Sequence, residues 1–157
     1  VTNGYEDASA SGAEYPLQVM NPHYLRRAHS VFDNIGWLRE AWTNPVFIST
    51  ADADAAGVSD GDTVLVSSPY GQCVRNACVD AGLMPGVVAL PHGAWVAVDE
   101  ETGIDVAGAD NCLTGPAPNG QGVSGYNSAL CKIEKYTGEA LAPDAEQPFR
   151  IVCKDGE

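Results

Sequence analysis

Short apolar runs separated by turn residues constrain the fold of this chain more than any other feature. Six runs are rich in β-branched residues or alternate apolar with polar residues, and proline, glycine or aspartate bounds most of them. They lie at residues 17–20, 46–48, 63–68, 73–79, 87–90 and 129–135. No internal repeat stands out. Strands therefore outnumber helices, and the pattern predicts a mainly β fold, a small barrel or sandwich with short helices between the strands.

A first short helix is predicted to begin near Ser30. Ser30 and Asp33 have the spacing of a capping pair. Apolar residues then follow at near-helical spacing, although Gly36 weakens the middle of the segment; they are Phe32, Ile35, Leu38 and Trp42. A helix that starts here would direct unpaired backbone N–H groups toward the residues before it.

A second short helix is predicted at residues 51–56. Ser49 or Thr50 supplies its N-terminal cap, and Gly57 ends it. Asp52 lies in its first turn, where a carboxylate is favoured by the helix dipole. We therefore assign Asp52 to helix capping and not to catalysis.

The composition indicates one globular domain that does not bind nucleic acid. The chain has 157 residues, 45% of them hydrophobic and 18% charged, and this length is sufficient to bury a core. Its formal net charge of −13 argues against nucleic acid and anionic membrane surfaces as partners. No apolar run is long enough to span a bilayer, and residues 1–4 lack the features of a signal peptide. We expect a mature or excised piece without direct membrane insertion.

The five cysteines do not form a metal-binding or redox motif. None are spaced as Cys-x-x-Cys, so neither an iron–sulfur ligand run nor a zinc ribbon is indicated. Cys73 and Cys78 have opposite parity on one predicted strand, which excludes a disulfide between them. We expect most of the cysteines to be small buried hydrophobic residues; they are Cys73, Cys78, Cys112, Cys131 and Cys153.

Residues 21–30, directly after the first predicted strand, concentrate cationic side chains. They include Arg26, Arg27 and two of the three histidines, His23 and His29. Guanidinium, imidazole and hydroxyl donors in one loop match the donor geometry that phosphates prefer, so this loop is a candidate anion site. Alternatively, the two arginines form salt bridges with aspartate and glutamate residues on the surface. The residues alone leave both interpretations open.

Composition also divides the chain into three parts. Residues 1–14 are rich in glycine, alanine, serine and acidic residues and are predicted to be a flexible lead-in. Residues 15–136 hold all the predicted strands, and residues 137–157 form a C-terminal extension. Within the middle part, residues 99–125 are dominated by turn-forming residues and are predicted to be a long loop.

Four stretches of the chain resemble a known family. They are Pro22-His23 with Arg27-Ala28-His29-Ser30, residues 46–62, residues 84–95, and residues 111–114 followed by Asn127 and the last predicted strand. In this order and spacing they resemble the C-terminal molybdopterin-dinucleotide-binding domain of the dimethyl sulfoxide reductase family of molybdoenzymes. Residues 84–95 are especially similar to dimethyl sulfoxide reductase catalytic subunits. The resemblance covers about residues 15–135.

The resemblance implies a fold and a function. The implied fold is a double-psi β-barrel of the aspartate-decarboxylase-like class. The implied cofactor is a pair of molybdopterin guanine dinucleotides (bis-MGD) that carries molybdenum, or tungsten in some relatives. Such a domain closes over the cofactor, while other domains of the same polypeptide supply the metal ligand and any iron–sulfur cluster. The chain is thus expected to be the cofactor-binding domain of an S-oxide or N-oxide reductase, with no catalytic residue or metal ligand of its own.

The resemblance also implies which residues contact the cofactor. Arg27 and Ser30 would donate to phosphate oxygens, and His23 or His29 would contact phosphate or pterin. The implied cofactor-binding set is Asn21, His23, Arg27, His29, Ser30, His92, Gly93, Trp95, Asn111 and Asn127. The chain departs from the family pattern at Asn21, at Ser49-Thr50 and at His92, where the family usually has threonine, Asn-Pro and often glutamine.

Partners and alternatives follow from the same observations. The expected partners are the remaining domains of a parent catalytic subunit and an electron-transfer subunit, and the parent is expected to be exported and associated with the outer face of the cytoplasmic membrane. The isolated domain is expected to be inactive and to lack the cofactor. An alternative is a self-standing barrel that acts as a binding or assembly subunit without a redox role. A less favoured alternative is a zinc site formed by His23, His29 and a cysteine.

Overall fold

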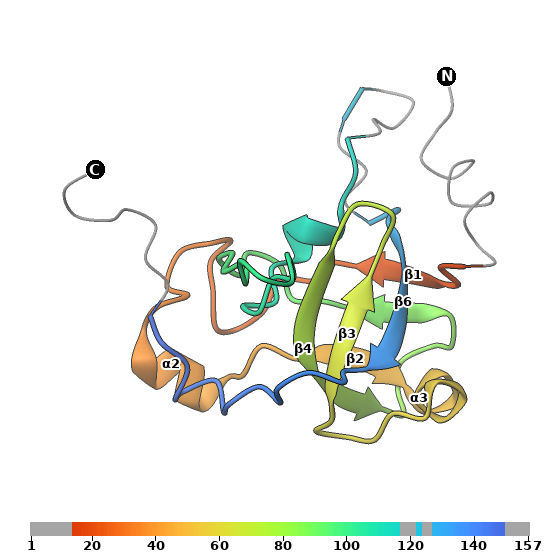
Figure 1. Ribbon diagram of the computed structural model, residues 1–157, viewed down its shortest axis with the longest axis horizontal. Coiled ribbons are helices and arrows are strands. Elements are labelled where there is room, and N and C mark those ends of the chain that lie inside the picture. Colours follow the sequence, from red (N-terminus) through yellow and green to blue (C-terminus); the bar gives the residue numbers. More distant parts are fainter. Residues whose placement is uncertain (1–13, 117–121, 124–126, 150–157) are drawn as a thin grey trace.

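The computed structural model describes residues 14–116, 122–123 and 127–149 and shows a closed six-stranded barrel (Figure 1). The strands are β1 (Leu17–Met20), β2 (Val46–Ser49), β3 (Thr63–Ser67), β4 (Gln72–Asp80), β5 (Val87–Ala89) and β6 (Leu130–Lys135). Around the barrel their order is β1-β5-β2-β4-β3-β6. All six predicted strands are therefore confirmed to within one or two residues at each end.

Mixed strand pairing closes the barrel. β1 pairs in parallel with β5, and β2 pairs in parallel with β4. β3 and β4 form an antiparallel hairpin, and β6 pairs antiparallel with both β1 and β3, so it is the closing strand. This architecture confirms the expected mainly β fold with short helices, the double-psi β-barrel.

The barrel interior is filled by alternate side chains of the strands. Because successive residues of a strand face opposite sides, one side chain in two points inward. The completely buried aliphatic side chains include Val19, Val46, Ile48, Val64, Val66 and Val88. Each such side chain stabilises the fold by about 1.5–3 kcal/mol relative to exposure, so the barrel has a core of its own.

Two core positions are cysteines, as the sequence predicted. Cys73 and Cys131 are fully buried among the aliphatic side chains, and Cys78 and Cys112 are partly exposed. These four are free thiols, whereas Cys153 lies outside the described residues. Burial raises the pKa of Cys73 to about 12, so this thiol carries almost no thiolate at neutral pH. The core cysteines therefore pack as small hydrophobic residues.

Helix α3 (Thr50–Ala56) begins and ends as its sequence predicts. Ser49 is the N-cap: its Oγ accepts a hydrogen bond from the Asp52 backbone N at 3.1 Å. Gly57 ends the helix with a φ of 65°, a left-handed conformation that glycine adopts without steric penalty. The Asp52 carboxylate accepts hydrogen bonds from Ser49 Oγ at 2.6 Å and from Gly86 N at 2.8 Å. It thus ties the helix to the turn before β5.

We expect Ser49→Ala to lower the free energy of unfolding by about 1–2 kcal/mol, because it removes the side-chain cap of α3. Urea unfolding followed by circular dichroism measures the change. Ser59→Ala is the matched control, since Ser59 is exposed on the turn before β3. Equal losses in the two variants would contradict the capping role.

The other helix does not begin where the sequence predicts. Helix α2 spans Gly36–Ala41, and its N-cap, Ile35, makes no side-chain cap hydrogen bond. The predicted start at Ser30 is wrong because Asp33 does not cap a helix; its carboxylate forms ion pairs with Arg26 and Arg27. Phe32 also has a φ of 80°, which breaks the helical path. The expected helix N-terminus directly after the loop at residues 21–30 is therefore not formed.

The described part of the C-terminal extension lies along the barrel and contains no strand. Leu141 N donates to Thr63 Oγ1 at 3.2 Å, and Arg39 Nη1 donates to the Gln147 carbonyl at 2.8 Å. Figure 1 shows this segment, in blue, passing from β6 towards α2. Residues 1–13 of the predicted lead-in (1–14) and the last residues, 150–157, lie outside the described residues.

Most of the predicted loop at residues 99–125 is irregular, as expected. Its one short helix among the described residues is η1 (Asp110–Leu113), while residues 117–121 and 124–126 are not described. Within the described ranges, no helix combines the length and hydropathy needed to cross a bilayer.

Candidate cofactor-binding site

Parallel pairing of β1 with β5 brings two distant loops together. The register pairs Met20 with Ala89, so the loops that leave these two strands emerge at the same end of the barrel. Leu90 N donates to the Met20 carbonyl at 2.9 Å, and His92 N donates to the Pro22 carbonyl at 3.3 Å. Residues 21–30 and 90–95, separated by some sixty residues of sequence, therefore form one surface.

All three histidines of the chain meet on this surface. The ring centroids of His23 and His92 lie 4.6 Å apart, those of His23 and His29 5.0 Å, and those of His29 and His92 5.1 Å. His23 and His29 are exposed and His92 is partly buried. Burial and the neighbouring His23 lower the pKa of His92, which favours its neutral form at pH 7. We call these three residues the histidine cluster.

Gly93 allows the two loops to touch. It has a φ of 89°, and a Cβ at this position would overlap the carbonyl group of His29. His29 itself has a φ of 53°, so the backbone is unusual on both sides of the contact. Only a residue without a side chain permits this close approach.

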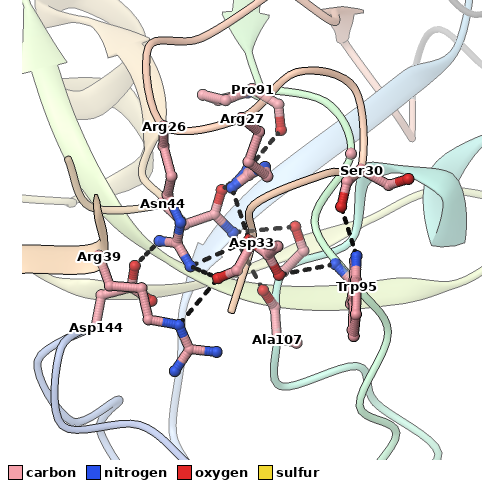
Figure 2. Close-up of polar contacts among 12 residues, drawn as sticks. Arg26, Arg27, Ser30, Asp33, Arg39, Asn44, Pro91, Trp95, Ala107 and Asp144 are labelled. Atoms are coloured by element: carbon pink, nitrogen blue, oxygen red, sulfur yellow. Dashed lines mark hydrogen bonds and ion pairs between the residues drawn. The ribbon is translucent and has the colours of Figure 1, made fainter. Parts of the chain in front are cut away.

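A hydrogen bond between Trp95 and Ser30 links the loop at residues 90–95 to the loop at residues 21–30. Trp95 Nε1 donates to the Ser30 carbonyl at 2.7 Å, and the Trp95 backbone N donates to Asp33 Oδ2 at 3.1 Å (Figure 2). The hydroxyl of Ser30 is on an exposed residue beside His29. The two predicted contacts, Ser30 and Trp95, thus belong to the same surface as the histidine cluster.

The arginine pair is buried, and both side chains contact Asp33 (Figure 2). Both guanidinium groups are buried and share Asp33 Oδ1, at 3.1 Å from Arg26 Nη2 and 3.2 Å from Arg27 Nη1. Arg26 also pairs with Asp144 of the C-terminal segment. The salt-bridge interpretation of the pair is therefore the one that the structure shows, with the carboxylates buried and not on the surface.

Arg27 supports the loop that carries His92. Its Nε donates to the His92 carbonyl at 3.3 Å, and its Nη2 donates to the Pro91 carbonyl at 3.4 Å and to Asn44 Oδ1 at 2.5 Å. Arg75, fully buried on β4, donates to the same Pro91 carbonyl at 3.0 Å and to the Pro45 carbonyl at 2.9 Å. The guanidinium groups of Arg27 and Arg75 thus both bind the backbone just after β5. Burial lowers the pKa of Arg75.

Asp110 connects the asparagines to the loops. Its carboxylate accepts hydrogen bonds from Gly93 N at 3.0 Å and from Asn21 Nδ2 at 3.2 Å, and it is almost fully buried. Asn127 Oδ1 accepts a hydrogen bond from Asn21 N at 2.9 Å, while Asn111 is exposed on η1 next to Asp110. The three predicted asparagines therefore surround the same end of the barrel as the histidines.

The structure adds supporting residues that the sequence analysis missed. Asp33 was assigned to a helix cap, and Asn44, Arg75 and Asp110 were not considered. Each acts through burial against a segment distant in sequence, and no local pattern signals such contacts. The one available signal was the strongly polar composition of the loop that holds Asp110.

Two polar atoms at the site have no hydrogen-bond partner within the described residues. They are His92 Nε2 and Asn21 Oδ1, and both are buried. Such atoms are uncommon in folded proteins because each lost hydrogen bond costs about 1–3 kcal/mol. Together with the exposed imidazoles of His23 and His29, they provide a donor and acceptor set that fits a polar ring system with phosphates.

Comparison with known proteins decides the family. The family model of the molydopterin dinucleotide binding domain matches residues 17–129, most of the barrel. The chain belongs to this family. It is thus the molybdopterin-dinucleotide-binding domain that the sequence indicated, and relatives of the chain include dimethyl sulfoxide reductases.

Curated relatives of the domain are oxidoreductases. It is 38% identical over 124 residues to the probable dimethyl sulfoxide reductase chain YnfF of Escherichia coli, covering 77% of this chain and 15% of that protein. It is 35% identical over 151 residues to the trimethylamine-N-oxide reductase of Haemophilus influenzae, covering 88% and 18% respectively. The domain thus spans less than a fifth of the length of either relative.

A solved structure has the same fold. The domain superposes on acetylene hydratase from Pelobacter acetylenicus with a TM-score of 0.62 and 22% identity, over 83% of this chain and 20% of that chain. At this identity the likeness concerns the fold alone.

Proposed function

We propose that this domain closes over a molybdopterin guanine dinucleotide in a larger molybdenum oxidoreductase that reduces an S-oxide or N-oxide. The carrying observation is the convergence of the histidine cluster, Ser30 and Trp95 on one polar surface formed by the loops after β1 and β5. The dimethyl sulfoxide and trimethylamine-N-oxide reductases among the relatives support the reaction class. The parent would include the remaining domains, would receive electrons from a partner subunit, and would hold residues 15–136 as its barrel domain.

In this proposal the exposed and unsatisfied groups bind the cofactor. Imidazole N–H groups of His23 and His29 and the Ser30 hydroxyl donate to phosphate or pterin oxygens. His92 Nε2 and Asn21 Oδ1 find the partners that the protein itself does not supply. The glycine at position 93 lets the loops that carry His29 and His92 meet, so that both loops can contact one ligand. Trp95 forms the outer wall, and Asn111 and Asn127 offer amide donors and acceptors to a pterin or guanine edge.

Arg27 has a different part in the proposal. Its guanidinium contacts the His92 and Pro91 carbonyls and the Asp33 carboxylate, so it is a positioning residue for the loop that presents His92. When bound, the metal of the cofactor supplies oxygen-atom or two-electron transfer. The domain contributes binding and orientation of the ligand that carries this metal.

Cofactor retention tests the proposed contacts. In the complete enzyme, replacing His23 and His29 together by asparagine is expected to lower the molybdenum and pterin content of the purified protein at least about tenfold, because each hydrogen bond to a charged group contributes about 1.5–3 kcal/mol. Elemental analysis and pterin fluorescence measure the content. Glu134→Gln, at an exposed position of β6, is the control. Normal content in the double variant would refute the contacts.

The domain alone is expected to be inactive. Reduction of an S-oxide with a reduced dye as electron donor should give no turnover with the 157-residue chain. The same assay on the complete enzyme is the positive control. Measured turnover by the isolated chain would contradict the proposal that the reacting centre is held by other domains.

A further inference from the structure

The histidine cluster has the composition of a transition-metal site. The nitrogen atoms that His23, His29 and His92 can offer all lie within 4.8 Å of one another. Imidazole nitrogen is a preferred ligand of zinc, copper, nickel and cobalt ions. The sequence analysis considered zinc on His23, His29 and a cysteine, and the structure brings His92 to these two histidines instead. Three ligands of one kind thus converge from two loops.

The geometry requires only small side-chain movements. Three nitrogens at about 2.0–2.1 Å from a tetrahedral ion are about 3.3 Å apart. His23 and His29 are exposed, so their side chains have room to rotate and shorten the present separations. His92 Nε2 is buried and has no hydrogen-bond partner within the described residues, so no protein contact must be broken to engage it.

The surroundings also favour a cation. The formal net charge of the chain is −13, which raises the local concentration of cations around the molecule. The Asp110 carboxylate accepts hydrogen bonds from Gly93 N and Asn21 Nδ2, and so it holds together the two loops that carry the histidine cluster. The Asp110 residue is almost fully buried, so its carboxylate supports the frame of the site from within the protein.

We propose that His23, His29 and His92 bind one divalent transition-metal ion such as Zn²⁺ through three imidazole nitrogens, with the fourth position open to water. This site does not require the dinucleotide, and it would be used when the loops are free of it. Because the same imidazoles serve the proposed cofactor contacts, metal and dinucleotide would exclude each other.

Titration of the 157-residue chain with metal alone tests the site. Isothermal titration calorimetry with Zn²⁺, under conditions that keep the thiols reduced, is expected to show one ion per chain. His23→Asn and His29→Asn should each weaken binding more than about 100-fold, since even partners outside the ligand shell change metal affinity by about 10–100-fold. Asparagine tolerates the positive φ of residue 29, so His29→Asn should still fold.

Cysteine variants provide the matched controls. Cys78→Ser and Cys112→Ser replace the two partly exposed thiols and should leave the Zn²⁺ affinity within about twofold. Co²⁺ gives a second readout: histidine ligation produces visible bands of a four-coordinate ion without a near-ultraviolet thiolate band. Circular dichroism establishes that every variant is folded.

Two outcomes would overturn the inference. Unchanged Zn²⁺ affinity in folded His23→Asn and His29→Asn variants would exclude the cluster, as would a thiolate band with Co²⁺ that Cys112→Ser removes. Both measurements use the chain without the dinucleotide. Failure of the chain to bind Zn²⁺ would therefore leave the molybdenum-retention test of the proposed function unaffected. Conversely, Zn²⁺ binding would not support the proposed function if the molybdenum-retention test failed.

Discussion

Asp33→Ala is expected to lower the free energy of unfolding by about 3–5 kcal/mol, the largest effect we anticipate at any single side chain. The Asp33 carboxylate pairs with Arg26 and Arg27, and all three side chains are buried. Removing the anion leaves two guanidinium groups close together in a region with little water. The free-energy cost of desolvating these two cations is then no longer offset by the shared Asp33 carboxylate.

The loss should extend to the candidate site. Asp33 Oδ2 also accepts a hydrogen bond from Trp95 N, and Arg27 holds the His92 carbonyl. Without Asp33, the loop at residues 90–95 loses the hydrogen bond from Trp95 N. The hydrogen bond from Arg27 to the His92 carbonyl is also weakened, because Asp33 no longer orients the Arg27 guanidinium. We therefore expect the Asp33→Ala variant of the complete enzyme to be deficient in molybdenum as well as less stable.

An exposed ion pair provides the control for this prediction. Lys132 Nζ and Glu134 Oε2 are 2.9 Å apart on β6, where their side chains are 35% and 56% exposed. Such pairs contribute at most about 1 kcal/mol, so Glu134→Ala should shift the urea midpoint only slightly. Equal shifts in the Asp33→Ala and Glu134→Ala variants would show that the buried ion pairs of Asp33 contribute no more to stability than an exposed pair.

Gly93→Ala is the second change with a large expected effect. Alanine at a φ of 89° is unfavourable by itself, by about 1–2 kcal/mol. Its Cβ would in addition overlap the His29 carbonyl, which is backbone and cannot rotate away. We expect a total loss of at least about 3 kcal/mol of stability, or separation of the two loops with loss of ligand binding.

Gly86→Ala separates the two causes. Gly86 has a φ of 84°, close to that of Gly93, but a Cβ there would meet no atom within 4 Å. This variant should therefore show the conformational cost alone, about 1–2 kcal/mol. Urea unfolding of both variants, with Zn²⁺ titration as a probe of the loops, measures the difference. Identical losses would mean that the close approach of Gly93 to His29 is unimportant.

The position of the arginine pair changes how the basic loop is understood. Sequence composition made the guanidinium groups the natural ligands for phosphate, but both are buried and form ion pairs with carboxylates of the chain. The imidazoles, which are weaker cations, occupy the exposed face instead. Binding at this surface is accordingly expected to depend on imidazole hydrogen bonds, and on arginine only through the shape of the loops.

The sequence by itself determined the strands, helix α3 and the family. Strand patterns repeat every second residue, and the cap at Ser49 and the glycine at position 57 are local signals, so these elements can be predicted from neighbouring residues. The motifs around Arg27 and at residues 84–95 were sufficient to indicate the molybdopterin-dinucleotide-binding domain, which the family match confirms.

Only the tertiary structure decided how the site is built. The residues alone could not show that His92 lies against His23 and His29, because this depends on the parallel pairing of β1 with β5. Nor could they show that Asp33 is a buried counter-ion and not a helix cap, since the stability of a buried carboxylate depends on cations and hydrogen-bond donors brought to it by folding. Local patterns record backbone preference, whereas burial and charge pairing are properties of the assembled barrel.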